Sequence, residues 1–316
     1  MVGLPSAVDV VAVGHVLVDL RFLVDRFPGP DEEARILDER RGVGGSAANV
    51  AIAVRRLGHS SAVIAKVGLD SFARVAVDDL IREGVDISGI RVSPTSPTGF
   101  SVVVRDRGGR IIIYGFKGAS EELEPREVDE ELIGRARCVH IASLRPDTSL
   151  HIARRARELG KIVSWDPGRV LASMGLPKLS RLLENVDIVL VNRYEAKEMT
   201  GADRYEEAAK VVAEHGPWAV VVKLGADGCY ALVRNRVLRL PAYPVEKVVD
   251  TTGAGDAFAA GLLVGLVRGW SFEDSLHHAS IVAALKVARL GSHAAPRKEE
   301  VMQYAEMIGV KLPTTT

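Results

Sequence analysis

The chain is organised around the stretch Asp250-Thr251-Thr252-Gly253-Ala254-Gly255-Asp256-Ala257-Phe258. The mostly apolar residues 245–249 before it are typical of the end of a strand, and a long apolar, helix-like run follows it as far as Val267. The pattern predicts a glycine-rich turn that opens a buried helix. Gly253 and Gly255 allow successive N–H groups to converge on one point, where the positive end of the helix dipole also lies. The sequence therefore predicts an anion site at this turn.

Asp256 lies in the first turn of the predicted helix, at the mouth of this anion site. Such a carboxylate can take a proton from a hydroxyl group while the amides of Gly253, Ala254 and Gly255 hold a phosphoryl group. A Walker A loop is excluded because no Gly-Lys-Ser/Thr ends the turn, and a dinucleotide fingerprint needs a small residue in place of Phe258. The other alternative is a helix cap whose glycines only allow tight packing, but it leaves the flanking Asp-Thr-Thr and Asp unexplained.

The composition is that of a soluble globular protein. Of the 316 residues, 47% are hydrophobic and 26% are charged. Lys plus Arg and Asp plus Glu each number 41, and this balance argues against a nucleic-acid-binding protein, which would show a basic excess. We see no signal peptide and no apolar run of about 18 residues, and we expect Cys138 and Cys229 to be buried free thiols. We therefore expect a cytoplasmic protein without nucleic-acid or membrane partners.

A second glycine-rich stretch, Gly42-Val43-Gly44-Gly45-Ser46-Ala47-Ala48-Asn49, precedes another helical pattern. It formally matches a dinucleotide fingerprint and so raises the alternative of an NAD-dependent oxidoreductase. The charged residues 38–41 before it are not a buried strand, so the context that this fingerprint requires is missing. Gly44 and Gly45 instead allow a ligand to approach the backbone closely, and Asn49 points from the first helical turn. The alternative role for Asn49 is local capping.

Together, these two stretches resemble the two signature motifs of the ribokinase-like (PfkB) family of sugar and nucleoside kinases, in the family's order. The resemblance covers about residues 8–310. It implies an enzyme that transfers the γ-phosphoryl group of ATP, in which Asp256 is the general base and residues 253–255 form the anion hole. Gly44, Gly45 and Asn49 would hold hydroxyl groups of the acceptor. A non-catalytic nucleotide-binding protein on the same fold is an alternative from another class, although the presence of Asp256 favours the enzyme.

Two segments predict a small β-sheet outside the main domain. Residues 16–41 are extended and partly charged, and residues 98–116 have the pattern of a hairpin around Gly108-Gly109. The family has a four-stranded lid that closes over the sugar and often pairs with a second subunit, so the resemblance implies a homodimer formed through the lid. From residue 138 onward, strand and helix patterns alternate, as in a parallel sheet flanked by helices. We expect one α/β domain over residues 1–316, with a three-layer α/β/α fold and the two lid segments inserted in it.

A nucleotide site is predicted where strands of this sheet end, because open α/β sheets bind ligands at that edge. Asn192 and Glu195 match the family's Asn-x-x-Glu motif, which helps to order Mg²⁺ and its waters around the nucleotide phosphates. The alternative is a helix cap paired with a glutamate three residues later. Lys223, Gly225 and Gly228 lie in a strand-end loop where the family contacts the nucleotide, and a plain turn is the alternative there.

A monovalent cation is a further ligand that the resemblance raises. Asp250 and Thr252 match positions where many family members bind such an ion through carboxylate and carbonyl oxygens. The cofactors that the resemblance implies are therefore ATP and Mg²⁺, and it leaves K⁺ open.

The acceptor prediction depends on Leu17 and Asp19. Asp19 matches the aspartate that holds the sugar in the family, and ribokinases usually have asparagine where this chain has Leu17. Since leucine cannot hydrogen-bond a hydroxyl group but can pack against a flat base, we expect a nucleoside or a ribose-like sugar. Fructose 6-phosphate or another phosphorylated or acidic sugar is the alternative, because Arg40, Arg41 and Arg105 could reach a substrate phosphate. A solvated lid face also explains these arginines.

Overall fold

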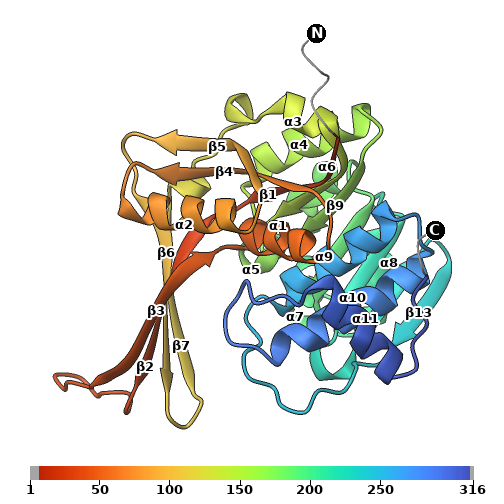
Figure 1. Ribbon diagram of the computed structural model, residues 1–316. Coiled ribbons are helices and arrows are strands. Elements are labelled where there is room, and N and C mark those ends of the chain that lie inside the picture. The colour runs from red at the N-terminus through yellow and green to blue at the C-terminus, as the bar shows by residue number, and fades with distance from the viewer. Residues whose placement is uncertain (1–6, 314–316) are drawn as a thin grey trace.

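The computed structural model describes residues 7–313, and its largest element is a nine-stranded sheet (Figure 1). The strand order is β13-β12-β11-β10-β9-β8-β1-β4-β5, in which only β12 and β13 run antiparallel to their neighbours. The strands are β1 (Val8–Gly14), β4 (Ser61–Gly68), β5 (Asp86–Ser93), β8 (Ala136–Ala142), β9 (Ile162–Asp166), β10 (Ile188–Asn192), β11 (Ala219–Lys223), β12 (Cys229–Val233) and β13 (Arg236–Leu240). The carboxyl ends of the parallel strands all meet one edge of the sheet.

Helices cover both faces of this sheet, which confirms the three-layer α/β/α fold. Strand β1 shows why its sequence is continuously apolar: Val10 and Ala12 pack into one buried cluster, and Val11 and Val13 into the other. The first cluster contains side chains of α1 (Ser46–Arg56), α2 (Ser71–Arg82), α9 (Ala254–Val267), α10 (Phe272–Val287) and α11 (Lys298–Met307). The second contains side chains of α3 (Glu130–Arg135), α4 (Pro146–Glu158), α5 (Gly168–Ala172), α6 (Leu176–Leu183), α7 (Arg193–Thr200) and α8 (Tyr205–Ala213). Cys138 and Cys229 are free and buried, as expected.

A separate four-stranded sheet projects from the main body and is the lid (Figure 1). Its strand order is β3-β2-β6-β7, so both segments that the sequence singled out contribute two strands. The bounds are β2 (Leu17–Val24), β3 (Ile36–Gly44), β6 (Thr98–Asp106) and β7 (Ile111–Gly118). Short 3₁₀ helices, η1 (Ala119–Glu121) and η2 (Pro125–Glu127), lead back from the lid to α3, and η3 (Gly225–Asp227) joins β11 to β12.

The register of the lid places particular side chains on its inner face, toward the main domain. Asp19 lies opposite Gly42 and Ser101, and Arg21 lies opposite Arg40 and Val103. Because side chains alternate between the two faces of a strand, Asp19 and Arg21 point to the same side. The lid therefore brings a carboxylate and an arginine together at the gap between the two sheets.

One expected element is absent: residues 245–249 do not form the end of a strand, and β13 stops at Leu240. The amides of Val249 and Asp250 instead donate to the carbonyl oxygen of Val287, at 2.7 and 3.1 Å. This segment therefore crosses to the end of α10 and does not pair with the sheet. None of the helices within residues 7–313 is long and apolar enough to cross a membrane.

Candidate active site

The amino terminus of α9 forms the centre of the candidate site. Gly253 precedes the helix with a φ of 79°, and a Cβ atom there would lie 2.1 Å from the carbonyl oxygen of Ser292. Only glycine therefore allows the turn to pack so closely. Asp256 follows in the first helical turn and is partly buried. The predicted juxtaposition of free helix amides and a carboxylate is present.

Desolvation and neighbouring charges set the protonation of Asp256. Burial, the largest cause, raises the pKa of Asp256 to about 6, and the nearby Asp166 carboxylate adds to this rise. A hydrogen bond from Asn49 and the charge of Lys223 act in the opposite direction. The carboxylate is thus ionised at neutral pH but holds its proton more tightly than an exposed aspartate does. Such a pKa suits a general base that works near pH 7.

Asn49 joins α1 to α9 at this point. Its Nδ2 donates to Asp256 Oδ2 at 2.7 Å. The side chain is 5% exposed, and its Oδ1 is one of the few buried polar side-chain atoms in residues 7–313 that have no hydrogen-bond partner. Since a buried acceptor without a donor is costly, a ligand hydroxyl group at this atom would satisfy it.

Asp19 is the second carboxylate of the site and is already surrounded by donors. Its Oδ1 accepts a hydrogen bond from Ser101 at 2.5 Å, and its Oδ2 accepts from Arg21 and Ser292, both at 2.6 Å. A Cβ atom at Gly44 would lie 2.3 Å from Asp19 Oδ1, so the absence of a side chain at Gly44 leaves room for the Asp19 carboxylate. The sequence analysis identified Asp19 and Gly44 but did not predict the three hydrogen-bond donors to Asp19.

The strand period gives a signal for two of these partners. Arg21 follows Asp19 by two residues in β2, and the register pairs Ser101 with Asp19 across the lid. Ser292 comes from the loop after α10, and its approach to the lid gives no signal in the sequence.

The base of the lid contributes a lysine that sequence reasoning also missed. Lys117 Nζ lies 3.4 Å from Nδ1 of the buried His15, which immediately precedes the Val16-Leu17 wall of the site. Burial lowers the pKa of both groups, that of His15 to about 3, so His15 is neutral and the remaining charge is on Lys117. A Cβ atom at Gly45 would lie 2.4 Å from the His15 carbonyl oxygen, which places the first glycine-rich stretch against the same wall.

Behind α9, the ends of three neighbouring strands carry charged and polar groups. Lys223 Nζ donates to Asp166 Oδ2 at 2.6 Å, and a Cβ atom at Gly255 would be 3.2 Å from the same ammonium group. Although burial opposes it, the carboxylates of Asp166 and Glu195 raise the pKa of Lys223. A permanent positive charge therefore lies beside the helix amides of the anion site.

Asn192 and Glu195 form a reciprocal capping box at the start of α7. Asn192 Oδ1 accepts from the Glu195 amide at 2.9 Å, and Glu195 Oε2 accepts from the Asn192 amide at 2.8 Å. Burial and then the Asp166 carboxylate raise the pKa of Glu195, whose side chain is almost fully enclosed. No cluster of three His, Cys, Asp or Glu side chains within residues 7–313 is arranged to hold a metal by itself. The oxygens of Asp166, Asn192 and Glu195 nevertheless fit Mg²⁺ that is held chiefly by nucleotide phosphates and water.

The remaining predicted residues lie around this centre. Gly225, in η3, has open space at the position of a Cβ atom, whereas a Cβ atom at Gly228 would meet the Leu240 carbonyl oxygen at 2.0 Å. Asp250 and Thr252 precede the turn at Gly253, and the Thr252 amide donates to Asp250 Oδ1 at 2.9 Å. Gly228 is therefore required by packing, while Gly225 leaves space for a ligand.

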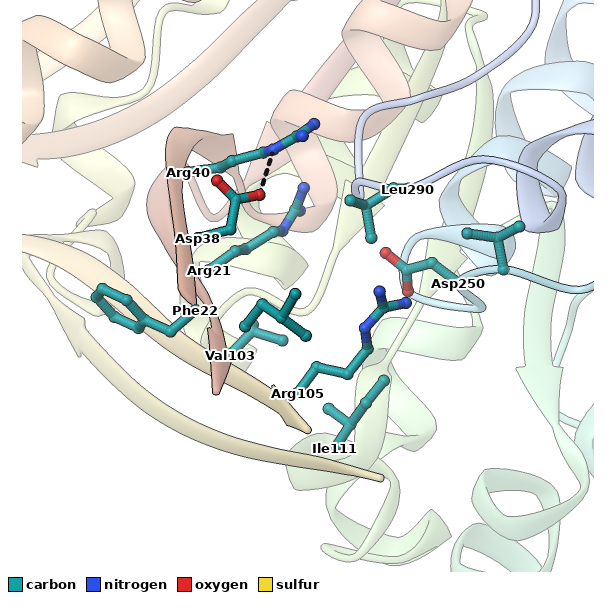
Figure 2. A pocket seen from close by; sticks show the side chains of 11 residues that line it. Arg21, Phe22, Asp38, Arg40, Val103, Arg105, Ile111, Asp250 and Leu290 are labelled. Atoms are coloured by element: carbon teal, nitrogen blue, oxygen red, sulfur yellow. Dashed lines mark hydrogen bonds and ion pairs between the residues drawn. The ribbon is translucent and has the colours of Figure 1, made fainter. Parts of the chain in front are cut away.

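The arginines proposed to bind a phosphate do not form one cluster. The Arg40 guanidinium group forms an ion pair with the Asp38 carboxylate at 3.1 Å. Arg41 is the next residue of β3, so its side chain lies on the opposite face of the sheet, where it pairs with the Glu39 carboxylate at 3.8 Å. Figure 2 shows Arg40 and Asp38 on one wall of a pocket, while Arg105 reaches from the lid toward Asp250 of the main domain. Arg40 and Arg105 thus line a cleft between the lid and the 249–250 segment, and Arg41 does not.

Comparison with known proteins agrees with this geometry. The model of the pfkB family of carbohydrate kinases matches residues 7–299. An ATP-dependent ribose-1-phosphate kinase of Halopiger xanaduensis is 36% identical, over 94% of this chain and 98% of that protein. A nucleoside kinase of Methanothermobacter thermautotrophicus is 31% identical, over 90% and 91% of the two chains. The structure of Arabidopsis thaliana ribokinase complexed with ribose and ATP superposes with a TM-score of 0.85 at 26% identity, covering 94% and 98%.

The match spans almost the whole chain, and the glycine-rich turns that carried the resemblance lie together at one edge of the sheet. The chain belongs to the pfkB family of carbohydrate kinases and is an ATP-dependent phosphotransferase with an alcohol group as acceptor.

Proposed function

We propose that this enzyme transfers the γ-phosphoryl group of ATP to a hydroxyl group of a ribose-based acceptor, with Asp256 as the general base. The observation that carries the proposal is the position of Asp256 at the amino terminus of α9, hydrogen-bonded to Asn49 and with its pKa raised to about 6. Asp256 takes the hydroxyl proton as the acceptor oxygen bonds to the γ-phosphorus. The bond from that phosphorus to the β,γ-bridging oxygen breaks, and ADP leaves.

The charge that develops on the phosphoryl group needs stabilisation. The amides of Gly255 and Asp256, which have no acceptor among the described residues, and the Lys223 ammonium group would face that position and supply fixed positive charge. Asn192 and Glu195, with Asp166, would hold Mg²⁺ through its water shell. The bound ion would neutralise the charge of the nucleotide phosphates.

The acceptor is held by Asp19, Gly44, Gly45 and Asn49 in this proposal. Asn49 Oδ1, buried and without a partner, would accept a hydrogen bond from an acceptor hydroxyl group. The Asp19 carboxylate would exchange part of its hydrogen bonds to Ser101 and Ser292 for hydroxyl groups of the sugar. Gly44 and Gly45 would act indirectly, because their missing side chains leave room for the Asp19 carboxylate and for the His15 carbonyl oxygen that line this site.

We infer that the acceptor carries an anionic group at the position that a base occupies in a nucleoside. Among residues 7–313, no carboxylate lies within hydrogen-bond distance of Lys117, although Glu121 and Asp19 favour its charged form from farther away; Lys117 lies against His15 and adjoins Leu17. An acceptor phosphate could supply the missing negative charge, which favours ribose 1-phosphate, and the similarity to the Halopiger enzyme supports this choice. A nucleoside is the second candidate, because Leu17 suits a flat base and the Methanothermobacter relative is a nucleoside kinase.

Replacing Asp256 with asparagine should remove most activity and keep the fold. General-base catalysis contributes roughly 10²–10⁴ in rate, so kcat should fall by about that factor while the Tm changes little. In the wild type, kcat should fall as the pH drops through about 6, because protonation removes the base. Steady-state kinetics at a series of pH values measures kcat, and thermal unfolding measures the Tm. A variant with more than about a tenth of wild-type kcat would falsify the role of Asp256.

A panel of acceptors under one condition should rank ribose 1-phosphate first in kcat/KM, ahead of adenosine, cytidine, inosine and ribose, with fructose 6-phosphate last. Lys117→Met should lower kcat/KM for ribose 1-phosphate by about 10–100-fold, since a charged hydrogen bond is lost, and leave ribose nearly unchanged.

Arg105→Met is the matched control for this panel, because it removes a cation from the lid–domain cleft and should not change the ranking. If a nucleoside ranks first and Lys117→Met has no effect, the acceptor is a nucleoside and the inference about Lys117 is wrong. If fructose 6-phosphate ranks first and Arg105→Met weakens it, the lid arginines bind the phosphate.

Glu195→Gln should raise the Mg²⁺ concentration that gives half-maximal rate by about 10–100-fold, because an outer partner of the ion loses its charge. Glutamine can still accept the Asn192 amide, so the capping box and the Tm should be kept. Glu198→Gln, on the exposed side of the same helix, is the control. An unchanged Mg²⁺ titration with unchanged kcat would mean that Glu195 only caps α7.

The lid should also pair with a second copy of the chain. Apolar side chains are exposed along the edge strand β7, where Tyr114 is 63% and Ile113 is 55% exposed. Contiguous exposed apolar patches of this kind often mark protein interfaces. Sedimentation analysis should therefore give a dimer, and Tyr114→Lys should give a monomer that keeps its Tm within a few degrees. A wild-type monomer at all concentrations would contradict the prediction.

A further inference from the structure

Lys286 is a charged side chain inside the core of the protein. It lies near the carboxyl end of α10, and its exposed fraction is 0%. Its Nζ donates to the carbonyl oxygen of Asp250 at 2.7 Å. Burial lowers the pKa of Lys286 to about 8, while the carboxylates of Asp250 and Asp256 favour the charged form and Arg21 disfavours it. The group therefore remains an ammonium ion at neutral pH.

The loop that receives this ammonium group is the one that leads into the anion hole. Asp250 Oδ1 accepts from the Thr252 amide and Asp250 Oδ2 from the Gly291 amide, both at 2.9 Å. With Lys286 on the main-chain oxygen, each of the three oxygens of Asp250 accepts a hydrogen bond from the protein itself. A metal ion bound to the main-chain oxygen would lie beside the Lys286 ammonium group, which is 2.7 Å from that oxygen and would repel it. The residues present therefore do not fit a monovalent metal ion at Asp250.

We propose that the Lys286 ammonium group is a built-in monovalent cation that positions the loop of residues 250–253, so that the enzyme needs no alkali-metal ion. The proposal rests on the proposed function, since it concerns the same anion hole. An ammonium group carries the same charge as K⁺ and, like it, binds carbonyl oxygens.

The position of the Lys286 ammonium group shows which part of the site its charge can influence. The Asp250 carbonyl oxygen lies three residues before Gly253, whose turn sets the direction of the first amides of α9. A donor fixed on that oxygen holds the turn, and a positive charge near Asp256 strengthens the field at the anion hole. Lys286 is therefore a positioning residue, because it acts through the turn and does not touch the acceptor.

The alternative is that Lys286 only compensates the dipole at the end of α10. A lysine in the last turn of a helix commonly does so from the surface, with its ammonium group in water. Lys286 instead points inward, to a carbonyl oxygen of another segment, and its burial carries a desolvation cost. A role in the loop of residues 250–253 accounts for this cost, whereas a helix-end charge does not require it.

The first test uses the wild-type protein in K⁺, Na⁺, NH₄⁺ and choline chloride at equal ionic strength. The rate and the Tm should be the same in all four salts. A rise in rate of about fivefold or more in K⁺ over choline, the lower edge of typical coupling between sites, would overturn the proposal. The Tm series needs no acceptor, so it remains informative even if the proposed acceptor is wrong.

The second test removes the charge with Lys286→Met, with Lys298→Met at an exposed position of α11 as the control. The Lys286 variant should lose about tenfold or more in kcat, and K⁺ or NH₄⁺ should restore part of the rate and raise its Tm above that in choline. The control should behave as the wild type. An undiminished kcat, or a loss that neither ion relieves, would mean that the charge of Lys286 does not support the loop. If the Lys286 variant does not fold, the wild-type salt series tests whether the enzyme needs an alkali-metal ion.

Discussion

The rest of the site depends on the contact between residues 249–253 and the loop that follows α10. The Val249 and Asp250 amides bind the Val287 carbonyl oxygen, the Gly291 amide binds Asp250, and Gly253 packs without a side chain against Ser292. These hydrogen bonds replace the strand pairing that the apolar residues 245–249 suggested. They fix the place where α9 begins, and with it the direction of the free helix amides. Catalysis by fixed dipoles requires such preorganisation, because mobile amides would have to be ordered during the reaction.

Negatively and positively charged side chains lie close together around the amino terminus of α9. Asp256, Lys223 and Glu195 lie in sequence-distant elements, and the Asp166 carboxylate helps to raise the pKa of all three groups. Burial raises the pKa of both Asp256 and Glu195, whereas Asp166 is paired directly with Lys223. The arrangement leaves Asp256 with a pKa of about 6 and places the Lys223 ammonium group beside the amino terminus of α9.

Polar side-chain contacts, in addition to the backbone, connect the lid to the loops around the start of α9. Asp19 on β2 accepts a hydrogen bond from Ser292, which also packs against Gly253, so one residue contacts both the lid and the turn before α9. Arg105, farther out on the lid, reaches toward Asp250 on the other side of the cleft (Figure 2). A movement of the lid would therefore change the surroundings of the loop of residues 250–253. These contacts would couple binding of the proposed acceptor to the geometry of the turn before α9.

The sequence predicts the layers of the fold, the lid strands and the glycine-rich turns, because periodicity and glycine are local signals. It also identified Asp256, Asn49 and Asp19 as candidates. It could not show that Asn49 bonds to Asp256, that Ser292 reaches Asp19, or that Lys117 lies beside His15, since these contacts join residues up to 273 positions apart. Lys286 gives the clearest case: in the sequence it is an ordinary lysine near a helix end. Only the packing of α10 against the loop of residues 250–253 turns its ammonium group inward, because burial and partners are properties of the assembled core.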